Sequence, residues 1–163
     1  MEWHVSKKKS IRVMAVASGG GHWIQLNRIA PAFAEMDVTF VTVRSTLRHM
    51  APENARFCVV PDATRWNRFR LIHLAFKMLY LIMRYRPQVV ISTGAAPGYF
   101  ALRIGRFFGA KTCWVDSIAN TEKLSLSGKA IKKHADLVLT QWPHLVEAPE
   151  QGGCSVEFAG AVM

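Results

Sequence analysis

The chain of 163 residues alternates short apolar runs, rich in β-branched residues, with segments of helical periodicity, and this alternation constrains its fold most. The predicted strands are residues 11–17, 38–43, 57–60, 89–92, 112–115, 137–140 and 156–159. The predicted helices are residues 24–35, 65–85, 98–108 and 127–134. Continuous apolar strands linked by helices form parallel sheets that are covered on both faces. We therefore predict an α/β fold, a Rossmann-like parallel sheet with helices on both faces.

The length fits a single domain that is large enough to bury a core. We expect residues 1–10 to form a basic N-terminal tail and residues 11–163 to form one Rossmann-like domain. The tail lacks the apolar region of a signal peptide, and no stretch reaches the roughly 18 apolar residues that span a bilayer. These features predict a soluble or peripheral protein.

The charge balance indicates an anionic partner, because 21 Lys and Arg residues against 11 Asp and Glu residues give a formal net charge of +10. Nucleic acid, anionic lipid and phosphorylated ligands all remain open on composition alone. The three cysteines are widely spaced and form no CxxC or Cys/His cluster. Their pattern predicts reduced thiols in a cytosolic compartment and no metal site.

The first predicted strand is followed by Ser18, three glycines and His22. Ligands of parallel sheets bind at the carboxyl ends of the strands, where glycines let a phosphate approach the backbone at a helix N-terminus. The spacing is neither that of a P-loop nor that of a dinucleotide fingerprint. The loop is either a phosphate cradle or a tight turn capped by Ser18. His22 is either a catalytic residue or simply a residue that starts the helix.

Two further strand ends carry candidate loops. Thr93 and Gly94 begin a second loop of small residues, which would share an anion site with the first loop if their strands are neighbours. Asp116 follows the predicted strand 112–115. Its carboxylate either acts as a base or orients one, or it forms an N-cap or Asx turn.

The predicted helix 65–85 has an unusually broad apolar surface. Four of its basic side chains fall on one narrow stripe: Arg70, His73, Lys77 and Arg84. Two interpretations remain open: a core helix with a solvated basic stripe, or a surface helix that dips into anionic lipid. The residues predicted to meet the membrane in the second case are Arg65, Trp66, Arg68, Phe69 and Arg70.

Four stretches in chain order carry a resemblance to a known family: residues 17–22 with GGH, 90–98 with STG, 115–129 with DS and SGK, and 135–142 with AD and QW. They resemble the acceptor-side subunits of split GT-B glycosyltransferases. These are the subunit of the dolichol-pathway N-acetylglucosaminyltransferase and, more closely, that of the bacterial PssD-type exopolysaccharide glycosyltransferases. A more distant likeness is to the N-terminal half of the peptidoglycan transferase MurG.

The resemblance implies the N-terminal half of a GT-B fold and a hexosyl- or glycuronosyltransferase subunit of polysaccharide or glycolipid biosynthesis. Such a subunit is active only with a separate donor-binding subunit, which brings the UDP-sugar. The implied acceptor is a polyprenyl-diphosphate-linked sugar, and the implied transfer is inverting and needs no metal or other cofactor. The implied location is peripheral, on the anionic surface at the cytoplasmic face of the cell membrane.

The resemblance also implies site residues. His22 and Asp116 fall at the positions proposed for acceptor activation. The implied set for substrate and diphosphate binding is Ser18, Gly19, Gly20, Gly21, Thr93, Gly94, Ser117, Glu122, Lys123, Ser127 and Gln141. Asp116 stands where the eukaryotic relatives usually carry glutamate. The N-terminal membrane-spanning helix of the eukaryotic subunit has no counterpart, so membrane contact is expected from elsewhere in the chain.

The alternative hypothesis is a stand-alone Rossmann-like module that binds a nucleotide or nucleic acid without catalysis. The basic residues are not interleaved with aromatics on a polar strand face, and no nucleic-acid-binding motif is present. We therefore expect no nucleic-acid partner.

Overall fold

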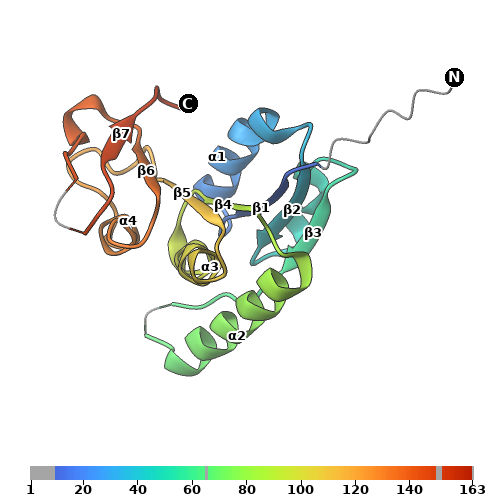
Figure 1. Ribbon diagram of the computed structural model, residues 1–163. Helices are drawn as coiled ribbons and strands as arrows, with labels where there is room; N and C mark the ends of the chain where they lie inside the picture. The colour runs from blue at the N-terminus through green and yellow to red at the C-terminus, as the bar shows by residue number, and fades with distance from the viewer. Residues whose placement is uncertain (1–9, 65, 150–151, 163) are drawn as a thin grey trace, which may run out of the picture.

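The computed structural model describes residues 10–64, 66–149 and 152–162. Residues 1–9 of the predicted basic tail and Arg65 of the predicted membrane contact lie outside these ranges. The described chain forms a seven-stranded sheet in the order β3-β2-β1-β4-β5-β6-β7, with all neighbouring strands parallel (Figure 1). The strands are β1 Arg12–Val16, β2 Asp37–Thr42, β3 Arg56–Val59, β4 Val89–Ser92, β5 Lys111–Val115, β6 Leu137–Thr140 and β7 Val156–Phe158. Every predicted strand is confirmed, with ends that differ by at most one residue.

Helices cover both faces of the sheet, as predicted. Helix α1 (Gly21–Ile29) lies on one face, and α2 (Arg68–Tyr85), α3 (Ala95–Phe107) and α4 (Leu126–Ile131) lie on the other (Figure 1). Short 3-10 turns form η1 (Ala30–Phe33), η2 (Ser45–Met50) and η3 (Pro143–Leu145). Alternate side chains of β1 point to opposite faces, so Val13 and Ala15 pack in the α1 core while Met14 and Val16 pack under α2 and α3.

The helix starts differ from the predictions. Helix α1 begins at Gly21 rather than at residue 24, and α3 begins at Ala95 rather than at residue 98. Pro97 fits the first turn of α3 because the first N–H groups of a helix have no intrahelical acceptor. Helix α2 begins at Arg68 because the Asn67 side chain accepts a hydrogen bond from the backbone N–H of Arg70, 3.0 Å away.

The strand order reverses between β1 and β4. The chain runs from β1 outward through β2 to β3, and then returns to place β4 on the other side of β1. Such a switch point opens a crevice between the loops that leave the two central strands. Those loops are the two glycine-containing segments singled out in the sequence. None of the described helices is long and apolar enough to cross a membrane.

Candidate functional site

The loop from β1 to α1 delivers its glycines directly to a helix N-terminus. Gly20 has a φ of 65°, in the left-handed region that favours glycine, and its carbonyl accepts the N–H groups of Trp23 and Ile24. No side chain caps α1, so the interpretation of this loop as a turn capped by Ser18 is wrong. Within the described residues, the N–H groups of Gly21 and His22 have no backbone acceptor, so these two groups can bind an anion.

His22 lies on the first turn of α1 and is tied to the loop that follows β4. Its Nδ1 is 2.9 Å from the Thr93 carbonyl oxygen, and the Thr93 hydroxyl donates to the His22 carbonyl over 2.6 Å. The imidazole lies so close to Gly94 that a Cβ there would be 2.4 Å from two ring atoms. The structure therefore brings together three predicted site residues from two loops.

The β4–α3 loop adopts an uncommon backbone conformation. Gly94 has a φ of 147°, and Ala95 has a φ of 66°, which is rare for a residue with a Cβ. The Ser92 hydroxyl accepts the Gly94 N–H over 3.1 Å. A Cβ on Gly98 would be 1.8 Å from that hydroxyl oxygen, so both glycines are required by close packing. Backbone strain of this kind is often found at functional sites.

Asp116 follows β5 and is 2 % exposed. Its carboxylate accepts four hydrogen bonds, from Trp114 Nε1 at 3.0 Å, Asn120 Nδ2 at 3.1 Å, and the Ser125 N–H and hydroxyl at 2.8 and 2.6 Å. A carboxylate has about four acceptor positions, so these donors occupy all of them. The structure makes Asp116 the centre of the loop between β5 and α4.

The SGK and QW motifs build the frame around that loop. The Ser125 hydroxyl caps α4 by accepting the Gly128 N–H at 2.8 Å, and a Cβ on Gly128 would be 2.9 Å from the Asp116 carboxylate. The Gln141 side chain donates to the Asp116 carbonyl at 3.3 Å, and Trp142 Nε1 donates to the Ile118 carbonyl at 2.9 Å. The SGK and QW motifs therefore fix the conformation of the loop after β5, at the carboxyl edge of the sheet.

Asp136, the acidic residue of the AD motif, joins β5 to the start of β6. Its carboxylate accepts the N–H and the hydroxyl of Thr112, each at 2.9 Å, and forms an ion pair with Arg106 at 2.8 Å. Burial alone would raise the pKa of Asp136, but the Thr112 hydrogen bonds and the charges of Arg106 and Lys111 lower this pKa below its ordinary value. The AD motif is therefore a structural link at the amino ends of these strands.

Arg44 is a site candidate that the sequence analysis missed. It follows β2, on the opposite side of β1 from Gly94, and its Nε is 3.4 Å from where a Cβ on Gly19 would lie. The side chain is exposed, and within the part of the chain that the structure describes its guanidinium has no ion pair or hydrogen bond. The sequence did contain a signal for Arg44, because this arginine directly follows the predicted strand 38–43, at a strand end where ligands of parallel sheets bind.

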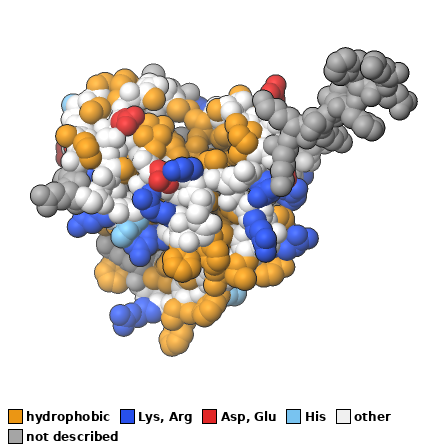
Figure 2. Space-filling model, in the orientation of Figure 1, with side chains coloured by type: hydrophobic (Ala, Val, Ile, Leu, Met, Phe, Trp, Pro, Cys, Tyr) orange, Lys and Arg blue, Asp and Glu red, His pale blue; other side chains and the backbone are white. Residues whose placement is uncertain are grey.

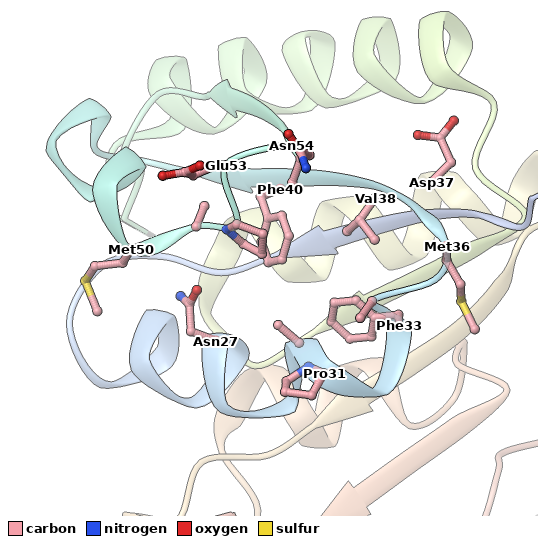
Figure 3. A pocket seen from close by; sticks show the side chains of 15 residues that line it. Asn27, Pro31, Phe33, Met36, Asp37, Val38, Phe40, Met50, Glu53 and Asn54 are labelled. Carbon is pink, nitrogen blue, oxygen red and sulfur yellow. The ribbon is translucent and has the colours of Figure 1, made fainter.

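A cavity of about 680 Å³ lies away from these loops, between η1, β2 and the turn before β3. Figure 3 shows Phe33 and Phe40 in its apolar wall and Asn27, Glu53 and Asn54 among its polar side chains. None of the predicted site residues lines it. Within residues 10–64, 66–149 and 152–162, no group of three His, Cys, Asp or Glu side chains is placed to hold a metal ion.

Residues 60–154 match the family described as "Oligosaccharide biosynthesis protein Alg14 like", a match over more than half of the chain. The chain belongs to the Alg14-like family. It is 27 % identical over 179 residues to the UDP-N-acetylglucosamine transferase subunit ALG14 of Mus musculus, covering 88 % of this chain and 81 % of that protein. The corresponding subunit of Yarrowia lipolytica is 32 % identical over 73 residues, covering 41 % of this chain and 34 % of that protein.

The Alg14-like chain has the fold of one half of a GT-B enzyme. MurG of Acinetobacter baumannii superposes with a TM-score of 0.74 and 14 % identity over 94 % of this chain and 46 % of MurG. This chain thus spans about half the length of MurG. A UDP-N-acetylglucosamine 2-epimerase superposes with a TM-score of 0.61 over 82 % of this chain and 42 % of the epimerase. Family and fold make the chain a glycosyltransferase subunit, which is not the stand-alone binding module considered as the alternative.

The remaining predicted residues of this Alg14-like chain are more scattered. Ser18 is half-buried beside the glycine loop, the Ser117 hydroxyl accepts the Ala119 N–H, and Gln141 is buried. Ser127 is half-buried on α4. Glu122 and Lys123 are exposed on the loop after β5. Of the predicted set, the structure brings the glycine loop, His22, Thr93 and Gly94 into one cluster, and it joins Asp116 and Gln141 in a second one.

Helices α2 and α3 expose a large apolar and basic surface, which we call the α2–α3 face. The sheet and its neighbours bury only Leu74, Met78, Leu81 and Ile82 of α2. Trp66 before the helix is 81 % exposed, Phe69 87 % and Phe107 at the end of α3 85 %. A groove of about 690 Å³ runs between the two helices, and Figure 2 shows hydrophobic and basic side chains gathered on this lower side of the molecule. The sequence analysis left open that this helix is a core helix with a solvated basic stripe. The exposed aromatic side chains argue against that interpretation.

Proposed function

We propose that this chain is the acceptor-binding subunit of a two-component glycosyltransferase that uses a UDP-sugar and a polyprenyl-diphosphate-linked acceptor. The observation that carries the proposal is the meeting of two glycine loops and His22 at the switch point between β1 and β4. Parallel α/β sheets bind ligands there, and helix N-termini there favour phosphate groups.

The donor site belongs to a separate subunit. This proposal is supported by the description of the mouse relative as a transferase subunit, 81 % of which is covered by the match. UDP-N-acetylglucosamine, which that description names, is the first donor to test. The partner supplies the other half of a GT-B fold, and the UDP-sugar lies between the two halves.

In the proposed reaction, His22 Nε2 accepts the proton of the acceptor hydroxyl as its oxygen attacks the anomeric carbon of the donor sugar. The bond from that carbon to the UDP oxygen breaks, and UDP leaves with the electron pair. The N–H groups at the starts of α1 and α3 and the guanidinium of Arg44 bind the diphosphate of the acceptor. Asp116 shapes the loop beside the site, because its acceptor positions are occupied by four donors.

The exposed α2–α3 face supports the further proposal that the subunit is a peripheral protein at the cytoplasmic face of the membrane. Neither helix carries an Asp or Glu, while their basic residues are Arg68, Arg70, Lys77, Arg84, Arg103 and Arg106. Exposed aromatic side chains enter the lipid interface, and each basic residue near an anionic surface contributes about 1 kcal/mol to binding. The isoprenoid tail of the acceptor lies in the same bilayer.

Reconstitution with a donor-binding partner tests the proposed activity. The complex is expected to transfer sugar from one member of a panel of UDP-sugars to a short polyprenyl-diphosphate-linked sugar, while the isolated chain transfers none. Efficient transfer by the isolated, monomeric chain would contradict the division into two subunits. No transfer by the complex with any donor would contradict the proposed function.

Flotation with liposomes tests the membrane contact. The chain is expected to float with anionic vesicles at low salt, and less with neutral vesicles or at high salt. The double variant Arg68→Glu, Arg70→Glu is expected to stay at the bottom of the gradient. The matched control Arg28→Glu, Lys123→Glu changes the net charge equally at exposed positions outside α2 and α3. Equal flotation of all three proteins would refute the assignment of this face.

A further inference from the structure

His22 and Thr93 are joined by two hydrogen bonds that run in opposite directions. His22 Nδ1 lies 2.9 Å from the Thr93 carbonyl oxygen, and the Thr93 hydroxyl donates to the His22 carbonyl over 2.6 Å. The two residues are 71 positions apart in the sequence. Thr93 is fully buried, and its own N–H donates to the Val16 carbonyl of β1 at 3.3 Å. All three polar groups of Thr93 are therefore used to hold the β4–α3 loop against the end of β1 and the first turn of α1.

This arrangement determines which nitrogen of the neutral imidazole carries the proton. A carbonyl oxygen can only accept a hydrogen bond, so Nδ1 must be the protonated nitrogen. The other nitrogen, Nε2, then has a free lone pair, and no residue in the described part of the chain forms a hydrogen bond with it. The His22 ring packs directly against the backbone of Gly94, so closely that a Cβ on Gly94 would overlap the ring. This packing limits the movement of the ring toward the β4–α3 loop.

We propose that Thr93 is the positioning residue of this site, which holds His22 in the Nδ1-protonated tautomer and leaves Nε2 to accept the proton of the acceptor hydroxyl. The inference rests on the proposed function for the acceptor and deepens it by assigning the basic atom. When Nε2 takes the proton, Nδ1–H still donates to the Thr93 carbonyl, which stabilises the imidazolium through a charge-assisted hydrogen bond. Thr93 is thus unavailable for the diphosphate contact that the sequence predicted for it.

The tautomer is measured on the isolated chain by long-range ¹H–¹⁵N correlation of the histidine rings, at about pH 9 so that the neutral ring is observed. The wild type is expected to show His22 protonated at Nδ1. Thr93→Val removes the hydroxyl that fastens the two loops, and is expected to increase the Nε2-protonated population. Thr93→Ser retains the hydroxyl and is expected to keep the wild-type pattern. A wild-type His22 protonated at Nε2 would overturn the proposal without any activity assay.

Turnover by the complex with its donor subunit provides the second measurement. Thr93→Val is expected to lower kcat about tenfold or more with KM changed less than about threefold, and Thr93→Ser to restore kcat. Thr140→Val is the matched control, because Thr140 is also buried at a strand end and its hydroxyl accepts the Trp142 N–H at 3.2 Å. Equal kcat for Thr93→Val and the wild type would overturn the positioning role. An inactive wild-type complex would count against the proposed function, while the ring spectra would still decide the tautomer.

Discussion

His22, on the first turn of α1, and Asp116, in the loop after β5, both lie at the carboxyl edge of the sheet, and the structure gives them opposite surroundings. His22 is half-buried and uses one ring nitrogen to hold a neighbouring loop. Asp116 is 2 % exposed, and four hydrogen bonds occupy its carboxylate. A proton acceptor needs a free lone pair, and a saturated carboxylate must break an existing bond to provide one. The difference indicates that His22 performs the chemistry and Asp116 holds the frame.

The largest expected effect on turnover is that of His22→Ala in the reconstituted complex. Loss of a general base lowers kcat by about 10²–10⁴. His22→Gln is a useful companion, because its amide can still donate to the Thr93 carbonyl but cannot act as a base. Both variants are expected to be nearly inactive and to retain the circular dichroism spectrum of the wild type. If kcat falls by less than about tenfold, another residue is the general base.

Gly94→Ala is expected to lower kcat about 10- to 100-fold, because a displaced catalytic group loses its orientation. The new Cβ would be 2.4 Å from the His22 ring, so the ring must move. Gly109→Ala is the matched control: Gly109 also has a positive φ, of 82°, but a Cβ there meets nothing within 4 Å. Both variants carry backbone strain, but only Gly94→Ala should change turnover. Equal kcat for the two would show that the ring position does not matter.

The sequence predicted the strands because each apolar run is continuous and bounded by turn residues, but it placed the start of α1 too late. Glycine is a poor helix former, so residues 19–21 were assigned to the loop. In the structure Gly21 is the first helical residue, which puts His22 on the first turn and within reach of Thr93. The contact between His22 and Thr93, which are 71 positions apart, depends on the path of the two loops, and local sequence patterns do not determine that path.

Local sequence patterns also could not predict the hydrogen bonds of Asp116 or the extent of the α2–α3 face. The donors to Asp116 come from Trp114, Asn120 and Ser125, and their spacing matches no N-cap or Asx turn. The periodicity of α2 shows an apolar surface but not how much of it the sheet covers. The aromatic end of α3, at Phe107, extends that surface, and only the tertiary arrangement places it beside α2.

Arg44→Ala is expected to raise the KM for the lipid-linked acceptor about tenfold, because hydrogen bonds to charged groups contribute about 1.5–3 kcal/mol. The effect on kcat should be small, since Arg44 binds the diphosphate rather than the reacting hydroxyl. Arg28→Ala removes the same charge from an exposed position on the last turn of α1 and serves as the control. Steady-state kinetics over a range of acceptor concentrations gives both constants. If Arg44→Ala and Arg28→Ala have the same KM, the diphosphate does not contact Arg44.

The smallest expected effect on turnover is that of Asp116→Asn, although this variant should be the least stable. The amide nitrogen would face either Trp114 Nε1 or the Ser125 N–H, depending on which carboxylate oxygen it replaces, so at least one buried group loses its acceptor, at a cost of about 1–3 kcal/mol. Urea unfolding should show this loss, while kcat per folded molecule stays within about threefold of the wild type. Asp62→Asn removes an exposed carboxylate and should change neither quantity. If Asp116→Asn keeps its stability and instead loses turnover as severely as His22→Ala, then Asp116 is the base and the roles of the two residues are reversed.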